Sequence, residues 1–343
     1  MENQYENEGH VCKNCGSYEV QDGYDLNLCR DCRKILAKRP IPRKILLFLL
    51  PVLLVVVISL FKFPASIESA LQLKRAEIAE SNKEYVTAMK YYEKLSDEYP
   101  EDIRIKYKLM DAYYYNNYPT DIYNTYEGLI GKEDTELMVS TITALLDKTN
   151  KYYSFSDELY SKLESLEDIS DENLLKVIRP FVDKNPNEIY GAYYVYDIYM
   201  DMGKYNEAKS IINRVMEKHP DFYYGYILQS NVYTELGDYE KALESAKTLF
   251  SVNSESVDSY ASMAKVELKR KNNEKGLELA KKAYELDSRN SEGCLTLALA
   301  YHYNNMLSER DELYSRCKEL GYVDEHSLEF YDSIFSGSKS WQE

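Results

Sequence analysis

An uncharged apolar stretch constrains this chain more than any other feature. Residues 45–61 read ILLFLLPVLLVVVISLF, and Ser59 is the only polar side chain among them. A helix rises about 1.5 Å per residue, so this stretch, extended by Phe63 and a snorkelling Lys62, just crosses an apolar bilayer core of roughly 30 Å. The sequence therefore predicts one transmembrane helix over residues 45–63.

Basic residues are concentrated before this segment. Seven lysines and arginines lie in residues 30–44 against the single Asp31, whereas Lys62 is the only basic residue close behind it. Basic flanks stay on the cytoplasmic side of a membrane. We expect a single-pass plasma membrane protein whose N-terminus is cytoplasmic and whose larger part is extracytoplasmic. The reversed topology remains open.

Two other interpretations of the apolar stretch are less favoured. A cleaved signal peptide has a short basic region and a small-residue cleavage site, whereas 44 residues come first here and Phe63-Pro64-Ala65-Ser66 is a poor site. A buried core helix would need other apolar stretches around it, and the sequence has none of comparable apolarity.

The negative charge lies after the apolar stretch. The chain has a net charge of −16, yet residues 1–44 carry eight basic and seven acidic residues. An acidic surface argues against nucleic acid or anionic lipid as a partner of the larger part. The basic run at 30–44 could bind nucleic acid or lipid headgroups, but a flank that orients the membrane helix is the simpler interpretation.

Four cysteines near the N-terminus have the spacing of a metal site. Cys12 and Cys15 form one Cys-x-x-Cys pair, and Cys29 and Cys32 form a second pair after thirteen residues. Four thiolates suit tetrahedral Zn²⁺, and a closed Cys₄ site is structural rather than catalytic. Gly16 suits the positive φ of the turn after the first pair. Residues 12–33 resemble the zinc-ribbon family, and the resemblance implies a fold held together by its metal.

The gap between the pairs is slightly shorter than usual but leaves room for a hairpin, with strand material at 18–20 and 24–26. Neither pair is followed by histidine, which argues against covalent haem. Thioredoxin-like redox chemistry would need one such pair in a βαβ setting. His10 is interpreted as a bystander.

The rest of the chain repeats with a period of 34 residues. Gly203-Lys204-Tyr205 recurs as Gly237-Asp238-Tyr239, and Ala208 recurs as Ala242. The pattern resembles the tetratricopeptide repeat, a helix–turn–helix unit. Small residues let the two helices approach closely, and the glycines end the first helix in a left-handed cap. The resemblance implies a right-handed all-α solenoid in which each repeat touches only its neighbours, with a concave face that binds proteins or peptides.

The organisation expected from these features has six parts. An earlier repeat covers 69–102, weaker repeats cover 103–136 and 137–170, an extra helix lies at 171–184, and a closing helix lies at 325–335. The predicted parts are a flexible N-terminus 1–11, a zinc ribbon 12–33, a basic juxtamembrane linker 34–44, the transmembrane helix 45–63, a repeat domain 66–336 and a flexible tail 337–343.

Tyrosine and cysteine provide the remaining candidates. The chain has 35 tyrosines, and most are interpreted as packing groups between repeats. Tyr193, Tyr226 and Tyr260 are candidate partner-binding residues, because they fall near the first-helix face that lines the groove in the resembled family. Cys294 and Cys317 fall side by side in a helical hairpin, where either a disulfide or two buried free thiols is feasible.

No residue pattern indicates catalysis. The histidines are scattered over separate repeats, and there is no phosphate-binding glycine loop or nucleophile elbow. We therefore expect a non-catalytic, membrane-anchored scaffold with structural Zn²⁺ and protein or peptide partners. The alternatives are a transmembrane sensor, in which the ribbon relays a ligand signal to a cytoplasmic protein or nucleic acid, and an enzyme with its site in the groove. The sequence leaves the oligomeric state and the partner open.

Overall fold

The computed structural model describes residues 11–37, 43–132, 135–166, 168–319, 323 and 325–342. Within these ranges the chain forms helices and no strand. It divides into two compact units, Met1–Glu68 and Ser69–Glu343, which are treated separately below. Residues 1–10 of the expected flexible N-terminus and residues 38–42 of the expected linker lie outside the described residues.

The first unit contains a small cysteine-rich head. The described residues of the head include the helix α1 (Arg30–Ala37), and its core consists of buried Cys12, Leu28 and Cys32. The strands expected at 18–20 and 24–26 do not form, and the described residues there make bends and extended segments. Two backbone hydrogen bonds join the two halves of the head, Lys13 N to Asn27 O at 2.9 Å and Gln21 N to Leu28 O at 3.2 Å, too few for a ladder.

The long helix α2 (Arg43–Ser81) begins in the first unit and ends in the second. Within the part of the chain whose side chains are described, no helix combines enough length with enough apolarity to cross a membrane. That part does not support the transmembrane helix expected at 45–63, and Leu46 and residues 58–63 of the expected span lie outside it.

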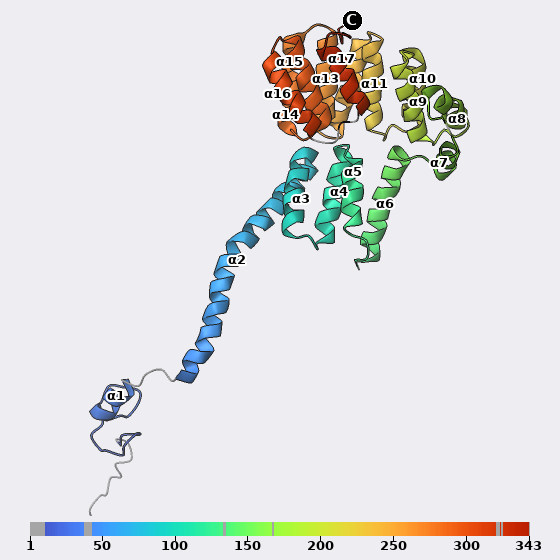
Figure 1. Ribbon diagram of the computed structural model, residues 1–343. Helices are drawn as coiled ribbons and strands as arrows, with labels where there is room; N and C mark the ends of the chain where they lie inside the picture. The colour runs from blue at the N-terminus through green and yellow to red at the C-terminus, as the bar shows by residue number, and fades with distance from the viewer. Residues whose placement is uncertain are drawn as a thin grey trace, which may run out of the picture. The chain divides into compact units, whose positions relative to one another are not determined.

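The described residues of the second unit form seven helix pairs. Figure 1 shows their arrangement. They are the end of α2 with α3 (Tyr85–Glu98), α4 (Ile103–Tyr115) with α5 (Pro119–Glu127), α6 (Glu136–Tyr153) with α7 (Asp157–Glu164), α9 (Ile189–Asp201) with α10 (Tyr205–Lys218), α11 (Tyr224–Glu235) with α12 (Tyr239–Thr248), α13 (Val257–Lys269) with α14 (Asn273–Leu286), and α15 (Ser291–Tyr303) with α16 (Leu307–Glu319). The extra helix α8 (Asp171–Lys184) and the closing helix α17 (Glu325–Phe335) lie where the sequence predicted them.

One backbone position fixes the turn inside most pairs. Gly203 and Gly237 have φ of 67° and 75°, the left-handed conformation that the sequence predicted for them. The equivalent positions of other pairs hold the described positive-φ residues that are not glycine, which are Lys83, Asn117, Lys271 and Asn305. The turn geometry is therefore kept even where glycine is replaced and the left-handed conformation costs more.

Small residues sit where the helices of a pair cross. Ala208, Ala242, Ala264 and Ala298 are fully buried. A Cβ added at Gly276 would lie 2.7 Å from the Leu268 side chain, so that position has no room for a larger residue. The close approach predicted from the small residues is confirmed.

The array of repeats closes on itself, which the sequence did not predict. One apolar cluster joins residues of the first pairs, such as Ala76, Met89 and Ala112, to Val257 and Ala261 of α13 and to Ala283 of α14. The teal helices α3 and α4 accordingly lie against the orange helices α13 and α14 (Figure 1). The expectation that each repeat touches only its neighbours is wrong, because the first repeats bury apolar surface against the sixth.

The C-terminal residues 337–342 pack against α13 and α14, whereas the sequence predicted a flexible tail. Trp341 Nε1 donates to Lys265 O at 3.2 Å, and Gln342 Nε2 donates to Leu268 O at 2.8 Å. Lys269 Nζ lies 4.8 Å from the centre of the Trp341 ring. A single tryptophan near the end of a chain is a large apolar group, and here it finds a partner on the repeats.

Candidate functional site

The four cysteines of the head converge on one point. Their Sγ atoms all lie within 4.8 Å of one another. Zn–S bonds of about 2.3 Å in a tetrahedron require sulfurs about 3.8 Å apart, and Cys15 Sγ lies 3.6 Å from Cys29 Sγ. The start of α1 positions the second pair, since Cys29 directly precedes the helix and Cys32 lies in its first turn. The cluster could hold a metal ion.

Local hydrogen bonds surround these sulfurs with donors. Cys32 N donates to Cys29 Sγ at 3.4 Å, and the Asn14 amide donates to Cys32 Sγ at 3.2 Å. The backbone N–H of Cys29 is the largest influence on Cys12 and lowers the pKa of that thiol to about 6. The Ser17 backbone lowers the pKa of Cys15, but hydrogen bonds with the other three thiols outweigh it and raise that pKa to about 12. The pKa of Cys32 is raised as well, although the Asn14 amide acts to lower it. Gly16 has φ of 77°, as predicted for the turn after the first pair. Donors that favour thiolate over thiol suit metal ligands.

A second site lies where the array closes. A cavity of about 420 Å³ separates α3, α4 and α5 from the inner helices α11, α13 and α15. Its apolar wall includes Met89, Ile227 and Leu295. Its remaining wall is mostly polar and includes Glu93, Tyr113, Asn117, Tyr118, Asp121, Tyr224, Asn231, Asp258, Lys265, Asp287, Arg289, Asn290, Ser291 and Glu292. The closure converts what would be an open groove into a walled pocket.

Both cationic side chains of this cavity already form ion pairs. Lys265 pairs with Glu292. Arg289 lies 3.1 Å from Glu93 and 3.3 Å from Asp287, and its pKa rises despite burial because of these two carboxylates. Five carboxylates and two cations line the cavity, so acidic groups outnumber basic groups by three.

Two of the carboxylates have no cation of their own. Asp258 on α13 accepts a hydrogen bond from the Asn117 amide at 3.4 Å; burial first, and then the neighbouring Glu292, raise its pKa to about 7. Asp121 on α5 makes no ion pair or hydrogen bond with the described residues. Burial and the nearby Glu93 raise its pKa as well. Both shifts come first from burial and second from a neighbouring carboxylate.

The three predicted tyrosines lie outside this cavity. Tyr193 packs against Tyr224 with ring centres 5.9 Å apart, Tyr226 donates to Pro220 O at 3.2 Å, and Tyr260 packs on Phe250 at 4.8 Å. Their role in partner binding stays a prediction. The tyrosines that line the cavity are Tyr113, Tyr118 and Tyr224. The repeat at 103–136 is too weak to predict which face of its helices Tyr113 and Tyr118 occupy.

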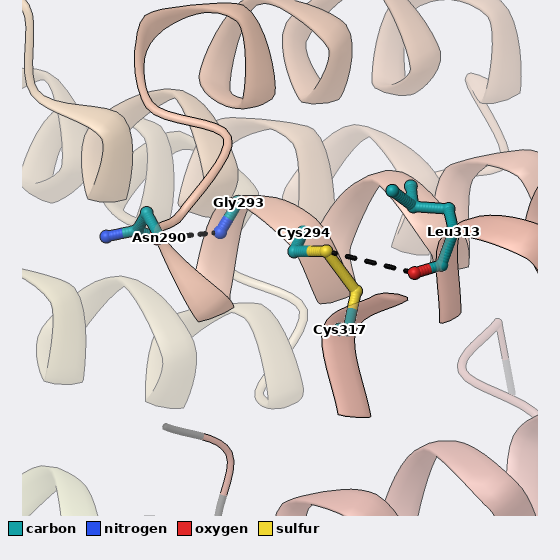
Figure 2. Close-up of a disulfide and its surroundings, with 5 residues drawn as sticks. All are labelled: Asn290, Gly293, Cys294, Leu313 and Cys317. Carbon is teal, nitrogen blue, oxygen red and sulfur yellow. Dashed lines mark hydrogen bonds between the residues drawn. A yellow bond between two sulfur atoms is a disulfide. The ribbon is translucent and has the colours of Figure 1, made fainter. Parts of the chain in front are cut away.

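A disulfide braces the helix that forms one wall. Cys294 on α15 is bonded to Cys317 on α16, with Cα atoms 5.9 Å apart, and both residues are fully buried (Figure 2). Asn290 caps α15 just before this bond by accepting a hydrogen bond from Gly293 N at 2.8 Å. Of the two possibilities that the sequence left open, the structure has the disulfide.

Comparison with known proteins identifies a helical-repeat protein. Two family models, both described as tetratricopeptide repeat, match residues 70–102 and 223–256. The chain therefore contains tetratricopeptide repeats. No curated protein matches the sequence.

Solved structures resemble parts of the chain. A thermophilic tetratricopeptide repeat protein of Thermus thermophilus is 19% identical, covers 49% of this chain and 100% of its own, and has a TM-score of 0.40. A tetratricopeptide repeat protein from Parabacteroides merdae is 12% identical over 77% of this chain and 97% of its own, also at 0.40. Yeast Tom70 is 15% identical over 77% of this chain and 60% of its own, at 0.37. Similarity at this level carries no conclusion about function.

Proposed function

We propose that this protein is a non-catalytic scaffold that binds protein or peptide partners on the inner face of its repeats. The cavity between α3–α5 and α11–α15 is the observation that carries the proposal, because concave sites with an apolar wall and a few polar groups are typical of ligand binding. Tetratricopeptide repeats support the same conclusion, since their helix pairs build extended binding surfaces.

A crosslinking pull-down with the full-length protein tests this function. We expect it to recover a specific partner that is lost when Leu295→Arg fills the cavity. The matched change Leu307→Arg, at an exposed position on α16, should leave recovery unchanged. Recovery of no partner, or equal loss with both variants, would contradict a scaffold role for the cavity.

The scaffold proposal includes a membrane anchor at residues 45–63, with the head in the cytoplasm and the repeats outside. Support comes from the exposed apolar side chains along α2 from Leu47 to Val57, because a helix that is apolar on all sides needs an apolar environment. The Cys294–Cys317 disulfide also suits an oxidising compartment.

Membrane fractionation tests the anchor. Leu53→Lys should release the protein from alkali-washed membranes, whereas Ile78→Lys, at another exposed apolar position on the same helix, should not. Protease added to spheroplasts should digest the repeats and spare the head. Digestion of the head alone would establish the reversed topology.

The proposal also assigns the head a structural Zn²⁺ bound by Cys12, Cys15, Cys29 and Cys32. The convergence of the four sulfurs supports this assignment. A bound metal would hold the head together, because its apolar core is too small to do so alone.

A further inference from the structure

We infer that the closed cavity selects a cationic segment, one that bears lysine or arginine side chains, from the partner that the scaffold binds. The inference rests on the proposed function and adds the chemistry of the partner. Its starting point is the partly open cavity itself, which has an apolar wall and polar groups on facing helices.

Charge complementarity identifies the occupant. The cavity has five carboxylates against one lysine and one arginine, so its net charge is negative even when Asp258 is protonated. Asp121 on α5 and Asp258 on α13 stand on opposite sides of the closure, and neither has a cation of its own among the described residues. An incoming ammonium or guanidinium group would offset this potential, whereas an anionic group would add to it.

The tyrosines that line the cavity suit the same occupant. The Tyr113 hydroxyl donates to Glu93 at 3.1 Å and the Tyr118 hydroxyl donates to Asp287 at 3.1 Å, so both ring edges are anchored. Among the described residues no lysine or arginine lies over the faces of Tyr113, Tyr118 or Tyr224. Elsewhere in the repeats, Lys148 already lies 4.2 Å from the centre of the Tyr114 ring. Tyrosine rings that lie beside carboxylates and have no cation of the protein over them attract cations.

An extended peptide fits better than a free polyamine because the lining also offers amides. Asn231 on α11 is partly buried, lines the cavity and makes no hydrogen bond with the described residues. A side-chain amide can donate to and accept from a peptide backbone, which a polyamine lacks. The apolar residues Ile227 and Leu295 would contact the methylene stems of the bound lysines.

Titration calorimetry on the full-length protein tests this inference. The probe is an acetylated and amidated peptide in which lysine alternates with serine, and its match carries glutamine in place of lysine. We expect the lysine peptide to bind and the glutamine peptide to bind at least about tenfold more weakly, the effect of about 1.4 kcal/mol in binding free energy. Spermidine should bind more weakly than the peptide. Equal binding of the two peptides, or tighter binding of spermidine, would overturn the inference.

Variants place the effect in the cavity. Asp121→Asn should weaken the lysine peptide about tenfold, and adding Asp258→Asn should weaken it further. The matched pair Glu240→Gln and Glu274→Gln, which removes two exposed carboxylates from α12 and α14, should change binding less than twofold. The single Asp121→Asn change keeps the test decisive if the double variant fails to fold. Equal effects of cavity and control variants would mean non-specific attraction and overturn the inference.

The two proposals fail separately. If the pull-down recovers a partner that binds the Asp121→Asn variant as well as the wild type, the scaffold function stands and the cationic preference is wrong. If no partner is recovered, the scaffold function itself is wrong.

Discussion

Arg289 Nη1 lies 3.1 Å from Glu93 Oε1, an ion pair that joins the segment before α15 to α3 across the closed array. Arg289 is half exposed, so the pair by itself contributes little to stability. It belongs to a seam that also includes Tyr118 with Asp287 and Thr87 with Glu255. These contacts make the cavity a closed pocket rather than a groove.

Glu255 caps α3 from a distant repeat. Its carboxylate accepts from Thr87 N and from the Thr87 hydroxyl, both at 2.7 Å, while the local N-cap residue Glu84 makes no side-chain cap. Glu255→Ala should lower the free energy of unfolding by about 1 kcal/mol, the usual loss for a helix cap. Hydrogen exchange should speed up in the first turn of α3. The control Glu274→Ala, at an exposed position on α14, should leave hydrogen exchange in α3 unchanged. If the array were open, Glu255→Ala would also leave exchange in α3 unchanged.

Removing the metal should unfold the head and spare the repeats. We expect about one zinc per chain by elemental analysis, lost in Cys12→Ser and retained in Cys294→Ser, because only the first residue belongs to the cluster. Chelation should make residues 12–37 susceptible to protease while the helical circular dichroism of the repeats persists. Purified protein without stoichiometric zinc, but with a protected head, would contradict a metal-held fold.

Reduction of the disulfide should destabilise the last repeat. The bond spans a sequence separation of 23, for which loop-entropy arguments give roughly 3 kcal/mol. Urea unfolding with and without reductant should show this difference, and Cys317→Ser should match the reduced protein. If mass spectrometry finds two free thiols in protein isolated from cells, the disulfide is absent there and no longer supports an oxidising compartment.

Asp258 should make stability fall as pH rises. Its pKa is about 7 in the folded protein and roughly 4 in the unfolded chain, so the folded state holds the extra proton between these values and loses the advantage as pH rises through 7. The titratable groups that act on Asp258 are Glu292, Lys265, Tyr118, Tyr153 and Tyr224. The amides of Asn117 and Asn290 act on it as well.

Asp258→Asn should remove this dependence. The wild-type protein loses free energy of unfolding as Asp258 ionises, and the variant has no such group. The stability of the variant relative to wild type should therefore rise by about 2 kcal/mol between pH 5 and pH 8. Thermal unfolding across this pH range measures the difference, with Glu274→Gln as the exposed control. A constant difference between wild type and Asp258→Asn at all pH values would show that Asp258 is ionised throughout.

Local signals in the sequence predicted most of the helices. Gly203 and Gly237 mark left-handed turns, and Ala208 and Ala242 mark helix crossings, because each of these demands comes from neighbours within one repeat. The pairing of Cys12 and Cys15 with the second cysteine pair also follows from spacing alone.

Closure and cavity could not be predicted in this way. Glu255 and Thr87 are ordinary polar residues in their own repeats, and their contact depends on how small rotations accumulate along the whole array. The place of Tyr118 at the cavity depends on the same closure, since its hydroxyl donates to Asp287 in a distant repeat. Trp341 likewise gave no periodic signal for its contact with α13.

Photo-crosslinking at Tyr118 tests the closed array most directly. Tyr118 replaced by p-benzoylphenylalanine should, on irradiation of the full-length protein, crosslink within its own chain to the segment around Asp287, which its hydroxyl contacts at 3.1 Å. The same group at Tyr123, whose hydroxyl donates to Asn150 at 2.7 Å, should crosslink to α6 and serves as the control. Crosslinks from position 118 confined to the adjacent repeats, with the control working, would show an open solenoid and contradict the closed cavity.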